Sequence, residues 1–219
     1  MRKRLATTLA ALGFLATASA CGDSTTGAQG IYMLLDTSGT YSVELQKAQQ
    51  VISAILTKLG PGDSFAVARI DTGSFSEKDI VARVTLDDRP SVANRQKRAF
   101  LLQVRRFVRE LKPAAYTDIT GGVLQATEYL DEKRASRKVI VIYSDLKEDL
   151  AKGYLRKNLR FKLDGYRVVA LNVTKLRTDN FDPRLYMGRL KLWQGRVRQG
   201  GGEWKVINNL ENLAELMPE

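Results

Sequence analysis

The sequence predicts an α/β fold in which a mostly parallel sheet is covered by helices on both faces. Short apolar runs alternate along the chain with longer segments whose apolar residues recur every three or four positions. The apolar runs, such as KVIVIY at 138–143, contain no polar alternation, which is typical of strands buried on both faces. Because parallel neighbours need a crossover connection, strands that alternate with helices favour a parallel sheet.

The predicted elements begin and end at recognisable residues. The first long helix stops at Gly60-Pro61-Gly62, and the second begins just after Pro90 and stops before Pro113. The second and third strands are separated by a glycine-containing turn, which favours a hairpin with one antiparallel edge strand. Strands are predicted at 31–35, 64–70, 79–86, 138–143, 167–173 and 204–207, and helices at 41–59, 91–111, 120–133, 182–197 and 209–217. This order describes a Rossmann-like, doubly wound, six-stranded sheet, with Trp193 and Trp204 expected in its core.

The first twenty residues are organised as an export signal. Three basic residues precede an apolar stretch at 5–15 that is too short to span a bilayer comfortably, and small residues follow. The cleavage region Ala18-Ser19-Ala20-Cys21 resembles the lipobox of bacterial lipoproteins, which implies that Cys21 is lipidated as the first residue of the mature protein. An ordinary cleavage site with a chance cysteine is the alternative. We therefore expect a lipoprotein signal peptide at 1–20, a flexible tether at 21–29 and a globular domain at 30–219.

A lipidated chain of this kind would lie in the bacterial cell envelope, on the periplasmic side. Gly22 stands where enteric lipoproteins carry an acidic inner-membrane retention signal, which favours the outer membrane where there is one. The formal charge is +11, and it falls to +8 without Arg2, Lys3 and Arg4. In an exported protein this charge favours contact with anionic lipid or acidic polymers and not with nucleic acid.

The long helix predicted at 91–111, with the lysine that follows it, concentrates part of this charge. A row of basic residues opposite the apolar stripe is most often a solvated face. The alternative is a surface at 91–112 that contacts anionic lipid or polymer as a second membrane signal. The basic residues are Arg95, Arg98, Arg105, Arg109 and Lys112.

The composition excludes several kinds of site. The chain has no histidine, which excludes Ser-His-Asp and Cys-His catalysis and any histidine-containing zinc site. Its single cysteine, Cys21, excludes an internal disulfide. A bound metal would therefore be held by oxygen atoms, which favours Mg²⁺, Mn²⁺ or Ca²⁺.

Oxygen-bearing side chains occur in three segments that would meet at the carboxyl edge of the sheet. Asp36, Ser38 and Thr40 follow the first strand, Thr117 lies in the loop AAYTDI, and Asp145 follows the strand KVIVIY. Ligands of such sheets bind outside the carboxyl ends of the strands. Hydroxyls and carboxylates without nitrogen or sulfur are the ligands of a small hard cation.

The motifs LLDTSGT, TDI and VIVIYSD, in this order and spacing, resemble the von Willebrand factor A (VWA) domain and its metal-ion-dependent adhesion site. The resemblance covers about residues 30–219. It implies that Asp36, Ser38, Thr40, Thr117 and Asp145 hold one Mg²⁺, with Mn²⁺ or Ca²⁺ as alternatives, and that a partner protein donates a carboxylate to the ion. Thr40 replaces a serine of the family motif. Two departures are the AAYT loop, where glycine often precedes the threonine, and Leu146, where glycine commonly follows the aspartate.

Simpler roles compete with metal binding at several of these residues. Asp36 and Ser38 would also suit the start of the helix that follows, as capping residues. Asp118 is expected to cap the next helix and not to ligate, so that it belongs to the rim of the site. Glu148 and Asp149 are expected as solvated rim charges. Asp36 is expected in a solvent-facing crevice, so that Asp36→Ala would leave the fold nearly intact.

The sequence thus favours a lipid-anchored binding module of the cell envelope that engages partner proteins through a divalent cation, and not an enzyme. A metal-free VWA scaffold for complex assembly is one alternative. The other is a metal-dependent phosphohydrolase, because LLDTSGT is similar to the Asp-x-Asp-x-Thr motif of haloacid-dehalogenase-like phosphatases. In that motif Ser38 replaces the carboxylate expected as acid and base, and no partner lysine motif is evident.

Overall fold

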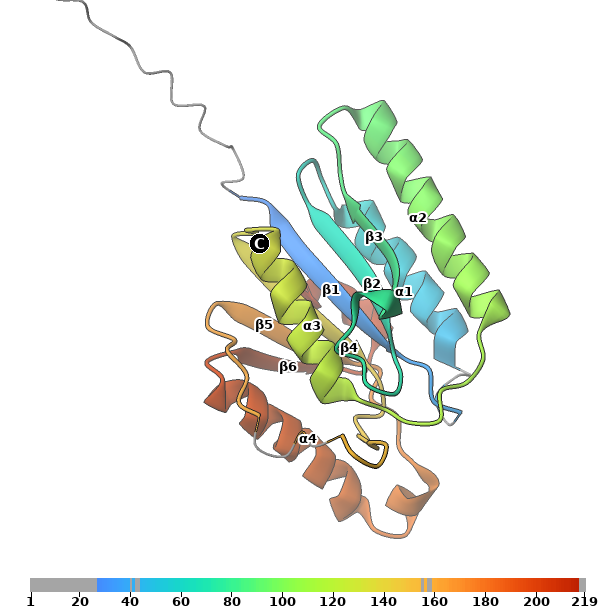
Figure 1. Ribbon diagram of the computed structural model, residues 1–219, viewed down its shortest axis with the longest axis vertical. Coiled ribbons are helices and arrows are strands. Elements are labelled where there is room, and N and C mark those ends of the chain that lie inside the picture. The colour runs from blue at the N-terminus through green and yellow to red at the C-terminus, as the bar shows by residue number, and fades with distance from the viewer. Residues whose placement is uncertain (1–26, 40, 42–43, 155, 157–158, 217–219) are drawn as a thin grey trace, which may run out of the picture.

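The structure, a computed structural model, describes residues 27–39, 41, 44–154, 156 and 159–216. Within these residues, six strands form one sheet with helices on both faces (Figure 1). The predicted signal peptide and Cys21 lie outside the described residues, as does Thr40. The lipid anchor and the role of Thr40 therefore stay predictions.

The sheet has the strand order β3-β2-β1-β4-β5-β6, and β3 is its only antiparallel strand. This confirms the predicted parallel sheet with an antiparallel edge strand. The chain builds the sheet outward from β1 to β3 and then crosses back to add β4 on the other side of β1. The carboxyl ends of β1 and β4 therefore flank a topological switch point, which is the usual ligand position in such sheets. The strands are β1 (Gln29–Asp36), β2 (Ser64–Ile70), β3 (Ile80–Thr85), β4 (Arg137–Tyr143), β5 (Tyr166–Leu171) and β6 (Glu203–Ile207).

Alternate residues of β1 face the two layers of helices. Ile31, Met33 and Leu35 belong to a core cluster that includes side chains of α1 and α2, while Tyr32 and Leu34 belong to a cluster with α3 and α4. All five are fully buried. The helices are α1 (Leu45–Lys58), α2 (Pro90–Glu110), α3 (Ile119–Glu132) and α4 (Pro183–Gln199), with 3₁₀ segments η2 (Glu77–Asp79), η3 (Arg177–Asn180) and η4 (Leu210–Leu216).

Helix α1 begins at Leu45 and not at residue 41, as the sequence predicted. Tyr41 is buried outside the helix: its ring packs edge-to-face on Tyr143 at 5.5 Å, and its hydroxyl donates to Asn172 O at 2.6 Å. Glu44 N, which precedes the helix, donates to Tyr41 O. Because the side chain of Tyr41 is held by these tertiary contacts, α1 begins at Leu45.

The predicted helix at 209–217 is wrong, because the described part of this segment, η4, is a 3₁₀ segment with non-helical angles at Asn212. Leu213 and Leu216 both pack on the first core cluster. Three residues per turn place side chains three positions apart on one side, so that 3₁₀ geometry suits this spacing. The third strand was also predicted one residue too early, since Asp79 ends η2.

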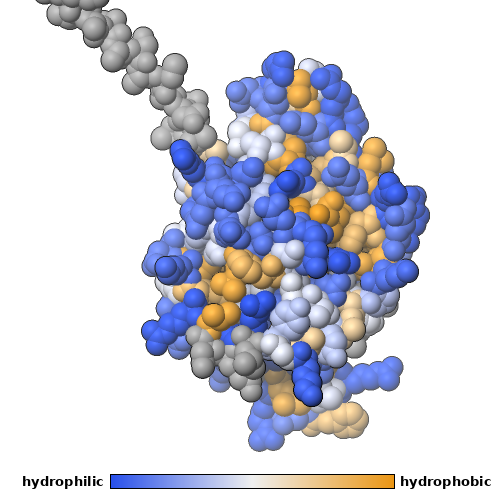
Figure 2. Space-filling model, in the orientation of Figure 1, coloured by the Kyte–Doolittle hydropathy of each residue, from blue (hydrophilic) through white to orange (hydrophobic). Residues whose placement is uncertain are grey.

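The chain enters the sheet at the amino end of β1, opposite the carboxyl ends of β1 and β4 (Figure 1). Hydrophilic residues cover most of the face shown in Figure 2, and apolar residues are visible between them in smaller groups. Among the described helices, none is both long and apolar enough to cross a membrane.

Candidate functional site

Three loops meet at the carboxyl ends of β1 and β4 around a cavity of about 270 Å³. The structure brings Ser38, Thr117 and Asp145 together in the wall of this cavity, as the sequence predicted for the three segments. Asp36 lies directly beneath, at the end of β1. The complete set of lining residues is Ser38, Gly39, Ala114, Ala115, Thr117, Asp145, Lys147 and Asp149.

Backbone hydrogen bonds join the three loops. Ala114 N donates to Thr37 O at 2.9 Å, which ties the α2–α3 loop to the end of β1. Thr117 N donates to Asp149 O at 2.7 Å, and Asp149 N donates back to Thr117 O at 3.0 Å. The AAYT loop therefore follows a defined path without a glycine, because its two ends pair with the loops on either side.

Asp36 positions its neighbours and is almost completely buried, with 1% of its surface exposed. Its Oδ1 accepts from Ser38 N at 2.9 Å and its Oδ2 accepts from Ser144 Oγ at 2.6 Å. The expectation that Asp36 lies in a solvent-facing crevice is therefore wrong. An Asp36→Ala variant would leave the buried hydroxyl of Ser144 without its acceptor, at a cost of about 1–3 kcal/mol, and would also remove the acceptor of the half-buried Ser38 N.

Asp36 and Ser38 do not cap helix α1. The N-cap position of α1 belongs to Glu44, which makes no side-chain cap hydrogen bond. Ser144 is a site residue that the sequence analysis missed. Its position directly after a buried strand and before Asp145 was the available signal, since one of two consecutive polar residues there must point inward.

Asp145 is a buried carboxylate with 3% of its surface exposed. Its Oδ1 accepts from Lys147 N at 2.8 Å. Burial, and to a smaller extent the charge of Asp36, raise the pKa of Asp145 to about 6, against the lowering effects of the hydrogen bond from Lys147 N and the charges of Arg189 and Lys147. Within the described part of the chain, neither Asp36 nor Asp145 forms an ion pair with a lysine or arginine side chain.

The residue after Asp145 explains one departure from the family pattern. Leu146 has a φ of 64°, in the left-handed region where glycine is favoured. Its side chain is buried, its amide donates to Ser144 Oγ at 3.0 Å, and its carbonyl accepts from Trp193 Nε1 at 3.1 Å. Burial of the leucine and these two hydrogen bonds offset the strain of about 1–2 kcal/mol that a left-handed residue costs.

Helix α4 supports the same turn through Arg189. Its Nε donates to Asp145 O at 3.0 Å, while its Nη1 and Nη2 donate to the two carboxylate oxygens of Asp179 at 2.9 and 2.8 Å. Arg189 and Trp193 lie four positions apart, on one face of α4. Nothing in the local sequence indicates that α4 packs against this turn, so Arg189 was not predictable as a site residue and Trp193 was predicted only as a core residue. Trp193 is fully buried in that core, and Trp204 packs partly buried against it.

The three predicted rim residues differ in their roles. Asp118 caps α3 by accepting from Gly121 N at 2.7 Å, and it pairs with Arg156 at 2.9 Å. Glu148 is not a freely solvated charge: its Oε1 accepts from Thr120 N at 2.6 Å and its Oε2 lies 3.5 Å from Arg196 Nη1. The open amides at the start of α3 attract this carboxylate. Asp149 is exposed and lines the cavity.

Comparisons with known proteins identify the fold. No family model matches the sequence, and no curated protein matches it. Among solved structures, the chain is similar to a von Willebrand factor type A protein from Catenulispora acidiphila, with 12% identity over 86% of this chain and 41% of the other, at a TM-score of 0.51. It is also similar to the PilB minor pilin from Streptococcus sanguinis, with 14% identity over 86% of this chain and 59% of the other, at a TM-score of 0.50.

The chain spans less than two thirds of each of these two structures. At 12% and 14% identity, the similarity concerns the fold, and the roles of individual residues cannot be transferred from these proteins. The sheet with five parallel strands and one antiparallel strand, covered by helices, agrees with that likeness. The chain therefore has a VWA-like fold.

Proposed function

We propose that this chain is a non-catalytic, lipid-anchored module of the cell envelope that binds partner proteins through a divalent cation at the carboxyl edge of its sheet. The observation that carries the proposal is the convergence of Ser38, Thr117 and Asp145, from three separate loops, on one cavity. Backbone hydrogen bonds join the loops that carry these residues. Such a preformed frame suits a binding site.

The chemistry of the cavity fits a small hard cation. Its side-chain donors are hydroxyl and carboxylate oxygens, the ligand type of Mg²⁺, Mn²⁺ and Ca²⁺. Two buried carboxylates, Asp36 and Asp145, lie near one another, and neither forms an ion pair with a lysine or arginine side chain among the described residues. Ser38, Thr117 and Asp145 would hold the ion, with Asp36 orienting Ser38, and Thr40 remains a proposed ligand outside the described residues. When bound, the ion would supply an electrophilic position for a carboxylate of the partner.

The residues of the chain also favour an acidic partner surface. Of the proposed ligands that line the cavity, Asp145 is the one carboxylate, so it would offset only part of the charge of the ion. Lys147 is exposed and lines the cavity, where its ammonium group attracts an anionic side chain. We therefore propose that the partner presents an exposed aspartate or glutamate.

The position of Asp36 argues against a phosphohydrolase. In that mechanism Asp36 would be the nucleophile, yet both of its carboxylate oxygens accept short hydrogen bonds and its side chain does not line the cavity. Ser38 at the second position of the motif supplies no carboxylate for acid and base catalysis. Binding is therefore the better supported role.

The direction in which the chain enters the sheet supports the envelope assignment. Residues 27–28 precede β1 at its amino end, and the cavity lies at its carboxyl end, eight residues of strand away. At about 3.3 Å per residue this separation is roughly 26 Å. A tether lipidated at Cys21 would thus present the cavity away from the membrane, toward proteins in the periplasm.

The anchor is tested by fractionation of cells that express Cys21→Ser. Because acylation supplies the membrane affinity in this proposal, the variant should leave the membrane fraction or remain unprocessed. The wild type should stay with the membranes after high-salt washing, which removes electrostatically bound proteins. A wild-type chain that is wholly soluble after lysis would contradict the anchor.

The cation site is tested by Mg²⁺-dependent stability of the wild type and of two matched threonine variants. With a dissociation constant near 1 mM, about 10 mM Mg²⁺ should raise the free energy of unfolding by roughly 1.4 kcal/mol. Thr117→Val should reduce this stabilisation because it removes a hydroxyl of the cavity. Thr120→Val is the control, since Thr120 Oγ1 is buried, has no hydrogen-bond partner among the residues that the structure describes and does not line the cavity.

Calorimetric titration with Mg²⁺ and Mn²⁺ supplies an independent measurement. Binding heat in the wild type, weaker binding in Thr117→Val and unchanged binding in Thr120→Val would support the site. No heat and no stabilisation at about 10 mM of either metal would leave the metal-free scaffold as the function.

A further inference from the structure

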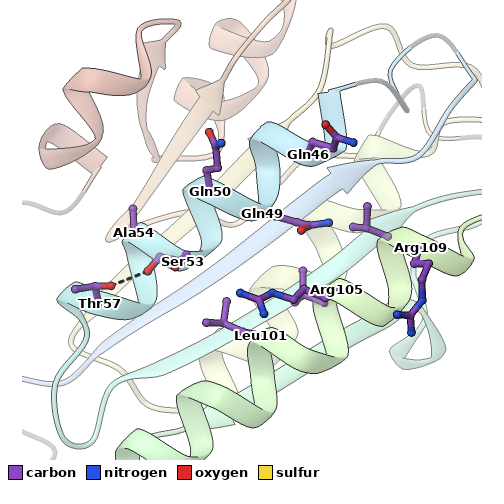
Figure 3. A pocket seen from close by; sticks show the side chains of 11 residues that line it. Gln46, Gln49, Gln50, Ser53, Ala54, Thr57, Leu101, Arg105 and Arg109 are labelled. Carbon is purple, nitrogen blue, oxygen red and sulfur yellow. Dashed lines mark hydrogen bonds between the residues drawn. The ribbon is translucent and has the colours of Figure 1, made fainter.

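The loop between β1 and α1 carries two of the proposed cation ligands, Ser38 and Thr40, and joins two elements that are packed in the core. Strand β1 is buried along its whole length. Helix α1 contributes Leu45 and Ala48 to the first core cluster and lies beside α2, with Gln49 pointing toward α2 (Figure 3). Since both elements are fixed by packing, the position of the two ligands depends on the short loop between them.

The first part of this loop is fixed from the side of β1. Thr37 Oγ1 donates to Ile70 O at 2.7 Å, and Thr37 O accepts from Ala114 N at 2.9 Å. The next amide, Ser38 N, donates to Asp36 Oδ1 at 2.9 Å. These three hydrogen bonds position the backbone as far as Ser38.

Tyr41 fixes the part of the loop that follows. Its amide donates to Ser38 O at 3.0 Å, which closes a turn over residues 38–41, and its carbonyl accepts from Glu44 N at 2.9 Å. Its side chain is 1% exposed, and its ring packs edge-to-face on that of Tyr143. The backbone of the ligand loop is therefore tied directly to a side chain in the core.

The hydroxyl of Tyr41 is held by Asn172, the first residue after β5. Tyr41 Oη donates to Asn172 O at 2.6 Å and accepts from Asn172 Nδ2 at 3.0 Å. Asn172 has a φ of 56°, in the left-handed region that asparagine adopts more readily than most residues. In this conformation the main-chain carbonyl and the side-chain amide of Asn172 both reach the same hydroxyl.

The same amide extends the network to the end of β4. Asn172 Nδ2 donates to Glu44 Oε2 at 3.1 Å and to Tyr143 Oη at 3.2 Å, and Tyr143 Oη donates to Glu44 O at 3.2 Å. Tyr143 ends β4, two residues before Asp145. Packing alone would be served by phenylalanine at position 41, whereas a buried polar network specifies one arrangement of the groups that it joins.

We propose that Tyr41 and Asn172 form a lock that holds residues 38–41 in the geometry of the cation site. Both are then positioning residues for the proposed ligands Ser38 and Thr40. Neither residue lines the cavity, so each would act through the loop and not by contact with the ion. The effect on cation affinity rests on the proposed function, while the lock itself does not. A loop that is already ordered lowers the free energy that binding must supply.

Tyr41→Phe tests the lock because it keeps the ring and removes the hydroxyl. Calorimetric titration of the full chain in a non-ionic detergent should show Mg²⁺ affinity weakened roughly tenfold, as for other groups that orient metal ligands. Tyr166→Phe is the matched control. Tyr166 is also buried, and its hydroxyl donates to Thr127 O at 3.1 Å and to Asp131 Oδ1 at 2.7 Å, but it lies at the amino end of β5. It should lower the midpoint of urea unfolding as well, yet leave Mg²⁺ affinity unchanged within about twofold.

Asn172→Gly tests the other half of the lock. Glycine adopts the left-handed conformation without strain, so this variant removes the amide and retains the carbonyl that accepts from Tyr41. Mg²⁺ affinity should again fall roughly tenfold. Arg134→Gly is the control, because Arg134 also has a left-handed backbone, with a φ of 51°, and is exposed after α3. It should relieve the same strain and leave the affinity unchanged.

Native-state hydrogen exchange in the presence of chelator measures the lock without the ion. The amides of residues 41 and 44 donate hydrogen bonds within the loop. They should exchange roughly tenfold faster in Tyr41→Phe and Asn172→Gly, because loss of the lock makes local opening of the loop easier. In Tyr166→Phe and Arg134→Gly these amides should exchange at the wild-type rate.

The results distinguish failure of the lock from failure of the cation site. Unchanged exchange in both lock variants, or an equal loss of Mg²⁺ affinity in Tyr41→Phe and Tyr166→Phe, would overturn the lock. If the wild type binds no Mg²⁺, the proposed cation site is wrong. Exchange in chelator then decides the lock by itself: faster exchange in the two lock variants supports it, and the wild-type rate contradicts it.

Discussion

Replacement of Asp145 by asparagine is expected to stabilise the metal-free protein at neutral pH while abolishing its affinity for Mg²⁺. Asparagine keeps the oxygen that accepts from Lys147 N and removes a buried charge. Because burial raises the pKa of Asp145 to about 6, ionisation of this side chain costs the folded state about 2–3 kcal/mol at pH 7. Loss of a charged ligand should weaken Mg²⁺ binding by roughly 100-fold or more.

The stabilisation should depend on pH in a defined direction. The folded protein binds the Asp145 proton more tightly than the unfolded chain, so the contribution of this group to stability is fully present below about pH 4 and is lost as the pH rises through about 6. The difference between Asp145→Asn and the wild type should therefore grow over this interval and then level off. Urea unfolding of both proteins in the presence of chelator, at a series of pH values, measures this difference in stability.

Mg²⁺ should reduce the difference in stability between Asp145→Asn and the wild type, because it should stabilise only the wild type. Asp149→Asn is the control, because Asp149 lines the same cavity but is exposed. It should change stability by less than about 0.5 kcal/mol at any pH. A destabilised Asp145→Asn protein at neutral pH would mean that the carboxylate is compensated by a group that the structure does not reveal.

Arg189→Leu is expected to destabilise the fold and to loosen the turn that carries Asp145. The side chain of Asp179 is fully buried, and its carboxylate accepts two hydrogen bonds from the guanidinium of Arg189. A third comes from Leu176 N. Leucine would leave this carboxylate buried with only the amide of Leu176 as donor, at a cost of about 3–5 kcal/mol. Asp145 O would also lose its donor, so Mg²⁺ binding should weaken as well.

The matched control for this effect lies on the same helix. Arg184 pairs with Asp182 through two hydrogen bonds, but its side chain is 91% exposed. Arg184→Leu should therefore leave the free energy of unfolding nearly unchanged, as expected for a surface ion pair. Denaturant unfolding compares the two variants, and similar costs would show that burial of Asp179 is not what makes Arg189 matter.

The fold was predictable because its signals are local. The run KVIVIY identifies β4 from six consecutive residues, and the breaks at Gly60 and Pro113 need no knowledge of distant contacts. The alternation of strands and helices then favours a parallel sheet, and the short turn before β3 favours an antiparallel strand at its edge. The order of the strands comes from the structure. Buried strands and helix breakers act within a few residues, so the sequence alone is sufficient for them.

The position of the site was also predictable from spacing. Asp36, Ser38 and Asp145 follow the ends of two strands, and parallel strands end at one edge of a sheet. Their surroundings were not predictable. Glu148 binds the start of α3 across 28 residues, and Trp193 reaches the carbonyl of Leu146 across 47.

The amino-acid sequence by itself determined the mostly parallel sheet with its antiparallel edge strand, the edge at which oxygen side chains gather and the charge along α2. Only the tertiary structure decided that Asp36 is buried and holds Ser144, that Leu146 adopts a left-handed backbone, and that Tyr41 stays outside α1. Each of these depends on contacts between distant parts of the chain, as the 131 residues between Tyr41 and Asn172 illustrate. Burial and pairing are properties of the packed molecule, because the same side chain costs or contributes free energy according to the partners that the fold brings to it.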